Sequence, residues 1–188
     1  MANLTDKLRK AGILNTVLIV LTMLCEAAGL LVMSAFSSDR ILNIANIIAL
    51  LCGIFYVFTG YRKGRAQFFK LFMIIYAFVS AYDVIADIAY CISAKITILC
   101  IIEILANVLA ALCVIILAFT SNFGKKASMR LGKINCYLTV VSDLVFGIFI
   151  YKDILVYADI YFGDMLLSCL ALLFITAKYV NKQTRGAK

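Results

Sequence analysis

The sequence predicts an all-α membrane protein: a polytopic bundle of six transmembrane helices, arranged as three tandem α-hairpin repeats with pseudo-threefold symmetry. Its composition supports this fold class first. Of the 188 residues, 65% are hydrophobic and 15% are charged, and the mean hydropathy is +1.05. A soluble domain is closer to half apolar and a quarter charged. A chain of this size has too little interior to hide so much apolar surface, so lipid must be its solvent.

Six apolar runs bounded by charged residues set the number of spans. Each is near the ~20 residues that a helix needs to cross ~30 Å of hydrocarbon, and all are too continuously apolar for a membrane β-barrel. Short connections join the first and second, third and fourth, and fifth and sixth runs, so each such pair is expected to form a helical hairpin. The predicted spans are Gly12–Phe36, Ile41–Gly60, Leu71–Ala94, Ile96–Ser121, Ile134–Tyr151 and Ile154–Ala177.

The basic residues orient this bundle. Of the 18 Lys and Arg residues, 15 precede the first span or follow the second, fourth and sixth, while Arg40, Lys95 and Lys152 stand one in each hairpin turn. The positive-inside rule therefore predicts that both termini are cytoplasmic. The net charge of +8 is explained by topology and by contacts with anionic membrane lipids, so no nucleic-acid partner is expected. The composition, rich in Ile, Lys and Asn, is compatible with a bacterial inner membrane.

Four residue types that recur at the same spacing in each predicted hairpin suggest an internal repeat. A Thr closes each even-numbered span, at positions 59, 120 and 176, and a Cys stands seven residues before each Thr. Thirty-three residues before each Thr stands an acid: Glu26, Asp87 and Asp143. A basic residue precedes each acid by a further 17 residues, which is about 25 Å of helix, so the three acids are expected at one level in the membrane.

Acidic residues inside the spans are the main functional signal. Seven of the ten Asp and Glu residues lie there, and no Lys or Arg lies deep in any span. A central acid costs ~2.5–3.5 kcal/mol to insert, so seven facing lipid would cost on the order of 20 kcal/mol. A marginally stable fold cannot carry this cost, so the acids are expected to face the interior. The candidate ligand-binding residues are Glu26, Asp83, Asp87, Glu103, Asn107, Asp143, Asp159 and Asp164.

Polar neighbours at helical spacing support an inward-facing polar stripe on each odd-numbered span. The even-numbered spans add shorter polar lines. The stripes are Asn15, Thr22, Glu26 and Gly29 on the first span, Tyr76, Ser80, Asp83 and Asp87 on the third, and Asn135, Thr139, Asp143 and Gly147 on the fifth. The shorter lines are Asn43 and Asn46, Glu103 and Asn107, Asp159 and Gly163, and Asp164 and Ser168.

Three interpretations of this polar interior stay open. Carboxyl, amide and hydroxyl groups can simply hydrogen-bond helices together. Alternatively, a ring of carboxylates attracts cations and repels anions, which suits a pathway for protons or metal ions. A third possibility is a pocket for an organic amine, in which Tyr76, Tyr82, Tyr90 and Tyr157 would offer aromatic faces to the cation.

Catalytic chemistry has little support. The chain has no His, which excludes His-based zinc sites and a Ser-His-Asp triad, and we expect no cofactor. Tyr82-Asp83 and Phe162-Gly163-Asp164 resemble the paired aspartates of intramembrane aspartyl proteases. However, Tyr161 replaces the first Gly of that family's GxGD motif, and its Pro-containing motif is missing from a chain without Pro. An aspartyl protease is therefore a remote alternative, and no catalytic residue is assigned.

The sequence thus predicts a membrane transport protein or channel for a cationic solute, such as a proton, a metal ion or an organic amine. The alternative is a non-catalytic membrane subunit, a solute-binding or scaffold component of a larger complex, with homo-oligomers or partner subunits. In size, span number and termini the chain is similar in outline to the substrate-binding subunits of energy-coupling-factor transporters. Small residues would let such a partner dock closely: Gly29, Ala45, Ala49, Gly53, Ala106, Ala110 and Ala111.

Overall fold

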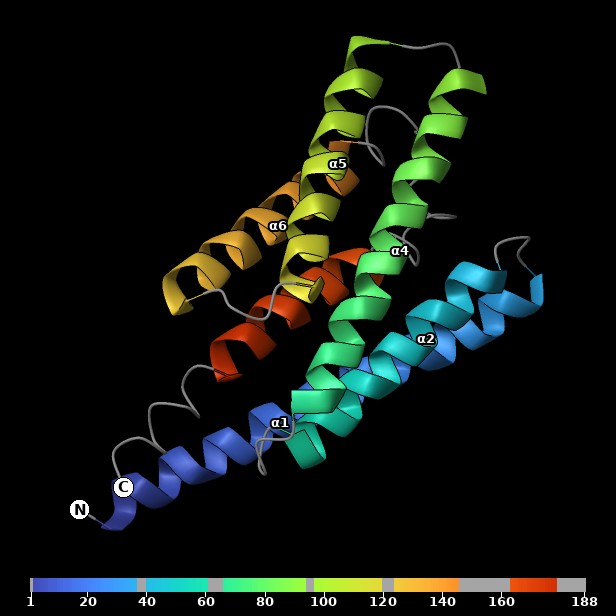
Figure 1. Ribbon diagram of the computed structural model, residues 1–188. Helices are drawn as coiled ribbons and strands as arrows, with labels where there is room; N and C mark the ends of the chain where they lie inside the picture. Colours follow the sequence, from blue (N-terminus) through green and yellow to red (C-terminus); the bar gives the residue numbers. More distant parts are fainter. Residues whose placement is uncertain are drawn as a thin grey trace.

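The computed structural model describes residues 2–36, 40–60, 66–93, 97–119, 124–145 and 163–178, and all regular structure in these ranges is helical. The predicted all-helical class is therefore confirmed for this part of the chain. The elements are α1 (Ala2–Phe36), α2 (Arg40–Phe55), the π-helical turn η1 (Tyr56–Gly60), α4 (Ala66–Ser93), α5 (Ile98–Phe119) and α6 (Lys125–Val145), followed by a last helix over residues 163–178 (Figure 1).

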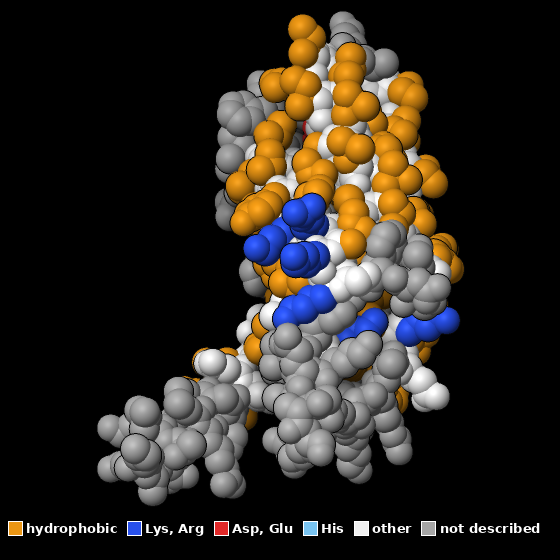
Figure 2. Space-filling model, turned by 60° about the vertical axis from the view of Figure 1, so that its left-hand side comes forward, with side chains coloured by type: hydrophobic (Ala, Val, Ile, Leu, Met, Phe, Trp, Pro, Cys, Tyr) orange, Lys and Arg blue, Asp and Glu red, His pale blue; other side chains and the backbone are white. Residues whose placement is uncertain are grey.

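Four helical segments are long and apolar enough to cross a membrane: Leu14–Val32, Arg40–Phe58, Gln67–Ser93 and Ile98–Phe119. Their outward side chains are largely apolar, and Figure 2 shows hydrophobic side chains covering much of the visible face above a band of Lys and Arg. A soluble monomer rarely exposes so large an apolar surface. The chain is accordingly an integral membrane protein with at least these four candidate spans. The end of the predicted fifth span and the start of the sixth, residues 146–162, lie outside the described residues.

Three helices begin five or more residues before the predicted spans. Helix α1 starts at Ala2 instead of Gly12, α4 at Ala66 instead of Leu71, and α6 at Lys125 instead of Ile134. The basic residues that the sequence places in the loop after the fourth span therefore lie in the first turns of α6. They are tolerated there because they occupy the exposed face of the helix, while small residues face the bundle. The exposed residues are Lys125, Lys126, Arg130 and Lys133, and the buried ones are Ser128, Gly132 and Asn135.

Consecutive helices pack against each other throughout the described chain: α1 with α2, α2 with α4, α4 with α5, and α5 with α6 (Figure 1). The last helix runs antiparallel to α6. Its Cys169 Sγ lies 3.8 Å from Cys136 Sγ, and its Thr176 hydroxyl donates to Met129 Sδ at 3.5 Å. The structure thus contains hairpin pairs of the predicted kind, whereas the threefold repeat and the count of six spans stay predictions.

Phe174 of the last helix is fully buried and packs this helix against η1 and α4. Its ring meets Tyr56 edge-on at a centroid distance of 4.9 Å and Phe72 at 5.1 Å. At Gly53, a Cβ atom would lie only 3.2 Å from Phe174 Cε2 and would overlap Met23 Cε, so any larger residue there requires these side chains to shift. Phe174 therefore fixes where the last helix sits against α2 and α4.

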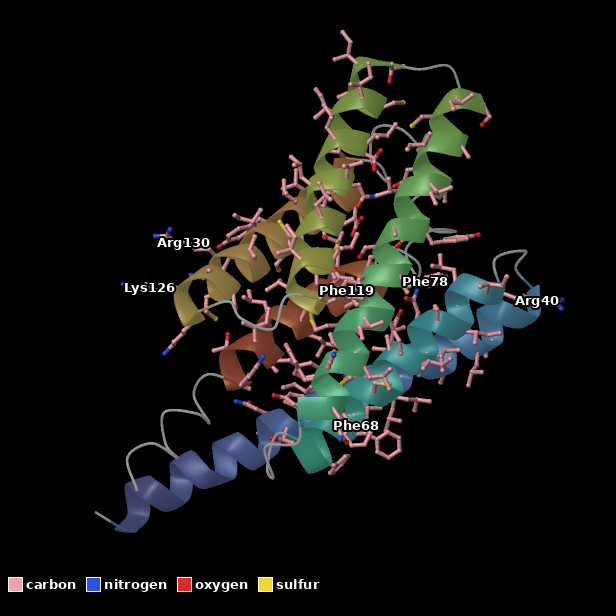
Figure 3. All side chains as sticks on the ribbon, in the orientation of Figure 1. Arg40, Phe68, Phe78, Phe119, Lys126 and Arg130 are labelled. Atoms are coloured by element: carbon pink, nitrogen blue, oxygen red, sulfur yellow. The ribbon has the colours of Figure 1, made fainter. Side chains whose placement is uncertain are left out.

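The described basic side chains are unevenly distributed over the bundle. Lys126 and Arg130 lie on the opposite side of the bundle from Arg40 (Figure 3). We call the end that holds the start of α4, the end of α5 and the start of α6 the basic end. The end that holds Ser93, Ile98 and Val145, where α4 and α6 end and α5 begins, is called the turn end. Six exposed basic side chains belong to the basic end. They are Lys125, Lys126, Arg130 and Lys133 of α6, Lys70 at the start of α4, and Lys178 at the end of the last helix.

Candidate functional site

Helix α4 supplies two carboxyl groups one helical turn apart, at Asp83 and Asp87. The rest of its polar stripe is buried, with Tyr76 at 1% exposure and Ser80 at 8%, while the two acids are half-buried. This face of α4 turns toward the bundle because its opposite face carries exposed Phe78 and Ile85. The inward stripe predicted for the third span is confirmed.

Asp87 of α4 contacts two side chains of α5, the amide of Asn107 and the carboxyl group of Glu103. The Asn107 amide donates to Asp87 Oδ2 at 2.5 Å, and the Glu103 carboxyl lies close enough to the Asp87 carboxyl to interact with it. Asn107 and Glu103 are one turn apart on α5, so both reach the same α4 side chain. From α6, the Ser142 hydroxyl donates to Glu103 Oε1 at 3.1 Å. Three helices therefore contribute to this first carboxyl pair.

A second carboxyl pair joins α4 to the last helix. The side chains of Asp83 and Asp164 lie close enough to interact with each other, although 81 positions separate them in the chain. Asp143 of α6 lies close enough to interact electrostatically with Asp164, Asp87 and Glu103. This residue therefore connects the two pairs into one cluster, which we call the acid cluster: Asp83, Asp87, Glu103, Asp143 and Asp164.

Glu26 approaches the same region from α1. A Cβ atom placed on Gly163 would lie 3.4 Å from Glu26 Oε1, so this carboxyl group lies against the start of the last helix, next to Asp164. Asp159, which the sequence also nominates, lies outside the described residues.

Two members of the acid cluster are buried and the other three are half-buried, and the hydrogen bonding of the cluster is incomplete. Glu103 is 2% exposed and Asp143 6% exposed. Within the described residues, four of its buried carboxyl oxygens have no hydrogen-bond partner: Asp83 Oδ2, Glu103 Oε2, Asp143 Oδ2 and Asp164 Oδ1. A buried oxygen without a partner is costly, and such groups in proteins commonly face a ligand, an ion or water. In the same described part of the chain, no three acid or Cys side chains are grouped so as to hold a metal ion.

The predicted stripe of the first span is largely wrong. Asn15, Thr22 and Gly29 are exposed, and only Glu26 of that set is half-buried. The Thr22 hydroxyl donates to the carbonyl of Leu18 at 2.9 Å, which satisfies it within its own helix. A polar residue at helical spacing therefore does not need an interior partner when its own backbone supplies one.

The other inward predictions are confirmed where they are described. Asn135 and Thr139 of α6 are buried, as are Asn43 and Asn46 of α2 and Ser168 of the last helix. Tyr76 OH donates to Asn135 Oδ1 at 3.3 Å, and the Asn135 amide donates to the Ala110 carbonyl at 3.3 Å. These bonds hold α4, α5 and α6 together one to two turns from the acid cluster. Gly147, predicted for the same stripe as Asn135, lies outside the described residues.

Ser142 is the contributor that the sequence did not single out. It is 1% exposed and bonds Glu103. Its spacing could have identified it, because Ser142 lies seven residues after Asn135 and therefore on the same face of α6.

Comparison of the chain with protein families, with curated proteins and with solved structures gave no match.

Proposed function

We propose that this protein is a membrane transport protein or channel whose acid cluster binds a cationic solute on its way across the bilayer. The observation that supports the proposal is the convergence of carboxyl groups from α4, α5, α6 and the last helix on one buried region, with Glu26 of α1 beside it. The described Lys and Arg side chains, apart from Arg40, lie toward the basic end, so they do not offer these carboxyls a local counter-charge. A buried group of acids without such a counter-charge must hold protons or a cation.

The two carboxyl pairs favour the exchange of protons for a cation. Two carboxyl groups held side by side in a poorly hydrated site repel each other when both are ionised, which favours a proton on one of them. We therefore expect the Asp83–Asp164 and Asp87–Glu103 pairs each to hold a proton when no cation is present. A cation that binds among them displaces those protons. Because the described residues offer no three-ligand metal set, a proton or an organic amine fits the cluster better than a metal ion.

Flux through the purified chain in proteoliposomes tests the proposal. Asp143→Asn and Glu26→Gln remove one carboxylate each while preserving shape, and both should reduce proton or amine flux at least tenfold relative to wild type. Asp6→Asn is the matched control, since this acid precedes the first apolar run. Equal flux in wild type, both site variants and the control would refute the proposed site. If the chain is a subunit of a larger complex, it would instead show no flux alone and would purify with a partner at fixed stoichiometry.

The Asp83–Asp164 contact favours one second candidate, hydrolysis within the membrane. Two aspartates that share a proton can activate a water molecule for attack on a peptide bond. These are the residues whose dipeptides resemble the intramembrane aspartyl proteases. Incubation with a transmembrane peptide distinguishes the two functions: cleavage by wild type that is lost in Asp164→Asn would establish the protease, and an intact peptide would exclude it for that substrate.

A further inference from the structure

Two cysteines meet at the turn end of the α4–α5 hairpin. Cys91 lies two residues before the end of α4, and Cys100 is the third residue of α5. They are 1% and 2% exposed and form a small apolar cluster of their own with Tyr90 and Ile104, separate from the main core. The hairpin therefore brings the two cysteines into one buried cluster at its turn end.

Cys100 contacts an exposed residue at the turn end. The Thr97 hydroxyl donates to Cys100 Sγ at 3.1 Å, and the Cys100 backbone N–H donates to Thr97 Oγ1 at 3.3 Å. Thr97 itself is exposed, so the sulfur of Cys100 is bonded to a side chain at the surface of the described chain.

The position of the pair decides its redox environment. The positive-inside rule predicts that the turn end faces away from the cytoplasm. Disulfides form and persist in such compartments. The chain offers an internal contrast in Cys136 and Cys169, whose sulfurs are 3.8 Å apart but lie mid-way along α6 and the last helix. Their mid-helix position places them at the level of the predicted spans, away from the aqueous phase that would carry an oxidant.

We propose that Cys91 and Cys100 are a redox site that forms a disulfide fastening the turn ends of α4 and α5. The oxidant is a small-molecule disulfide in the outer compartment. One cysteine loses its proton and attacks a sulfur of this reagent, releasing one small thiol and forming a mixed disulfide. The other cysteine loses its proton and attacks the protein sulfur of that mixed disulfide, releasing the second small thiol. The two protons end on the two released thiols, so two electrons pass from the protein to the reagent.

The disulfide would lie beside the acid cluster. Asp87 precedes Cys91 by one helical turn, and Glu103 follows Cys100 by three residues, so the covalent link lies next to the Asp87–Glu103 contact. It would limit how far α4 and α5 separate at that contact. The existence of the disulfide is independent of the proposed function, whereas any effect of reduction on flux depends on it.

Thiol mapping by mass spectrometry tests the proposal. The full-length protein in detergent micelles is incubated with oxidised glutathione, denatured, alkylated, reduced and alkylated with a second reagent. We expect the second label on Cys91 and Cys100 only and the first label on the other five cysteines. Free Cys91 and Cys100, or a link between Cys136 and Cys169 in their place, would overturn the proposal.

Two variants make the result specific. In Cys91→Ser the exchange stops half-way, so Cys100 should retain a glutathione adduct, whereas Cys136→Ser should form the Cys91–Cys100 link as the wild type does. Oxidised wild type should also unfold several degrees higher than the reduced protein, because the cross-link restricts the unfolded chain. Cys91→Ser should lose this difference. An unmodified Cys100 in Cys91→Ser would contradict the exchange mechanism.

Discussion

Replacing Phe174 by alanine should detach the last helix from its place in the bundle. The ring is fully buried, so its removal leaves a void of roughly 100 Å³, which at about 24 cal/mol per Å³ costs about 2 kcal/mol. The edge contacts with Tyr56 and Phe72 contribute about 0.5–1.5 kcal/mol each. Because lipid is as apolar as the core, little is added for transfer out of water. We therefore expect a loss of about 3–5 kcal/mol, which is at least roughly a hundredfold in the folded-to-unfolded ratio.

Unfolding in mixed micelles with increasing SDS, followed by far-ultraviolet circular dichroism, measures this loss. Phe78→Ala is the matched control, because this ring on α4 is 57% exposed and should change stability by less than about 0.5 kcal/mol (Figure 3). Equal shifts of the transition for the two variants would show that Phe174 does not anchor the last helix. The position of Asp164, on the same helix, would then also be unsupported.

Two further predictions concern packing and polar contacts. Gly53→Ala should destabilise the protein by about 1–3 kcal/mol through overpacking against Met23 and Phe174. Gly29→Ala is the control, because a Cβ atom there meets nothing within 4 Å, and it should be neutral or stabilising by up to about 1 kcal/mol. The same SDS titration measures both variants, and identical effects would contradict the packing at Gly53. Tyr76→Phe removes the buried hydrogen bond to α6 and should cost about 1–3 kcal/mol by that titration, while an unchanged transition would mean that this bond contributes nothing to helix packing.

The sequence predicts much of the site because burial follows simple periodicity on α4, α5 and α6. The polar stripes that contain Asp83 and Asp143 turn inward because an acid facing lipid is expensive. The same reasoning fails on α1, where the Thr22 hydroxyl donates to the Leu18 carbonyl of its own helix and can therefore face outward. Periodicity also predicts which face of a helix is buried, but not which other helix packs against that face.

Contacts between distant helices could not be predicted from the sequence. The pairing of Asp83 with Asp164 depends on where the last helix lies, and that position is set by Phe174, Tyr56 and Gly53 acting together. Nothing in the sequence marks Phe174 among 13 phenylalanines as the anchor. Likewise, the small residues suggested for docking a partner are mostly used inside the bundle, since Ala49, Gly53, Ala110 and Ala111 are buried there.

Ligand-induced stabilisation of the purified protein tests most directly whether the gathered carboxyls hold a cation. The thermal unfolding of wild type, Asp143→Asn and Asp6→Asn is measured with and without a small organic amine, using tetramethylammonium as a control cation that has no N–H or O–H group to donate. A ligand at a hundred times its dissociation constant stabilises the folded state by about 2.7 kcal/mol. We predict that the amine raises the unfolding temperature of wild type and Asp6→Asn, releasing protons into the medium, and that Asp143→Asn loses most of this shift. The same shift in all three proteins, without proton release, would contradict a cation site built from these carboxyls.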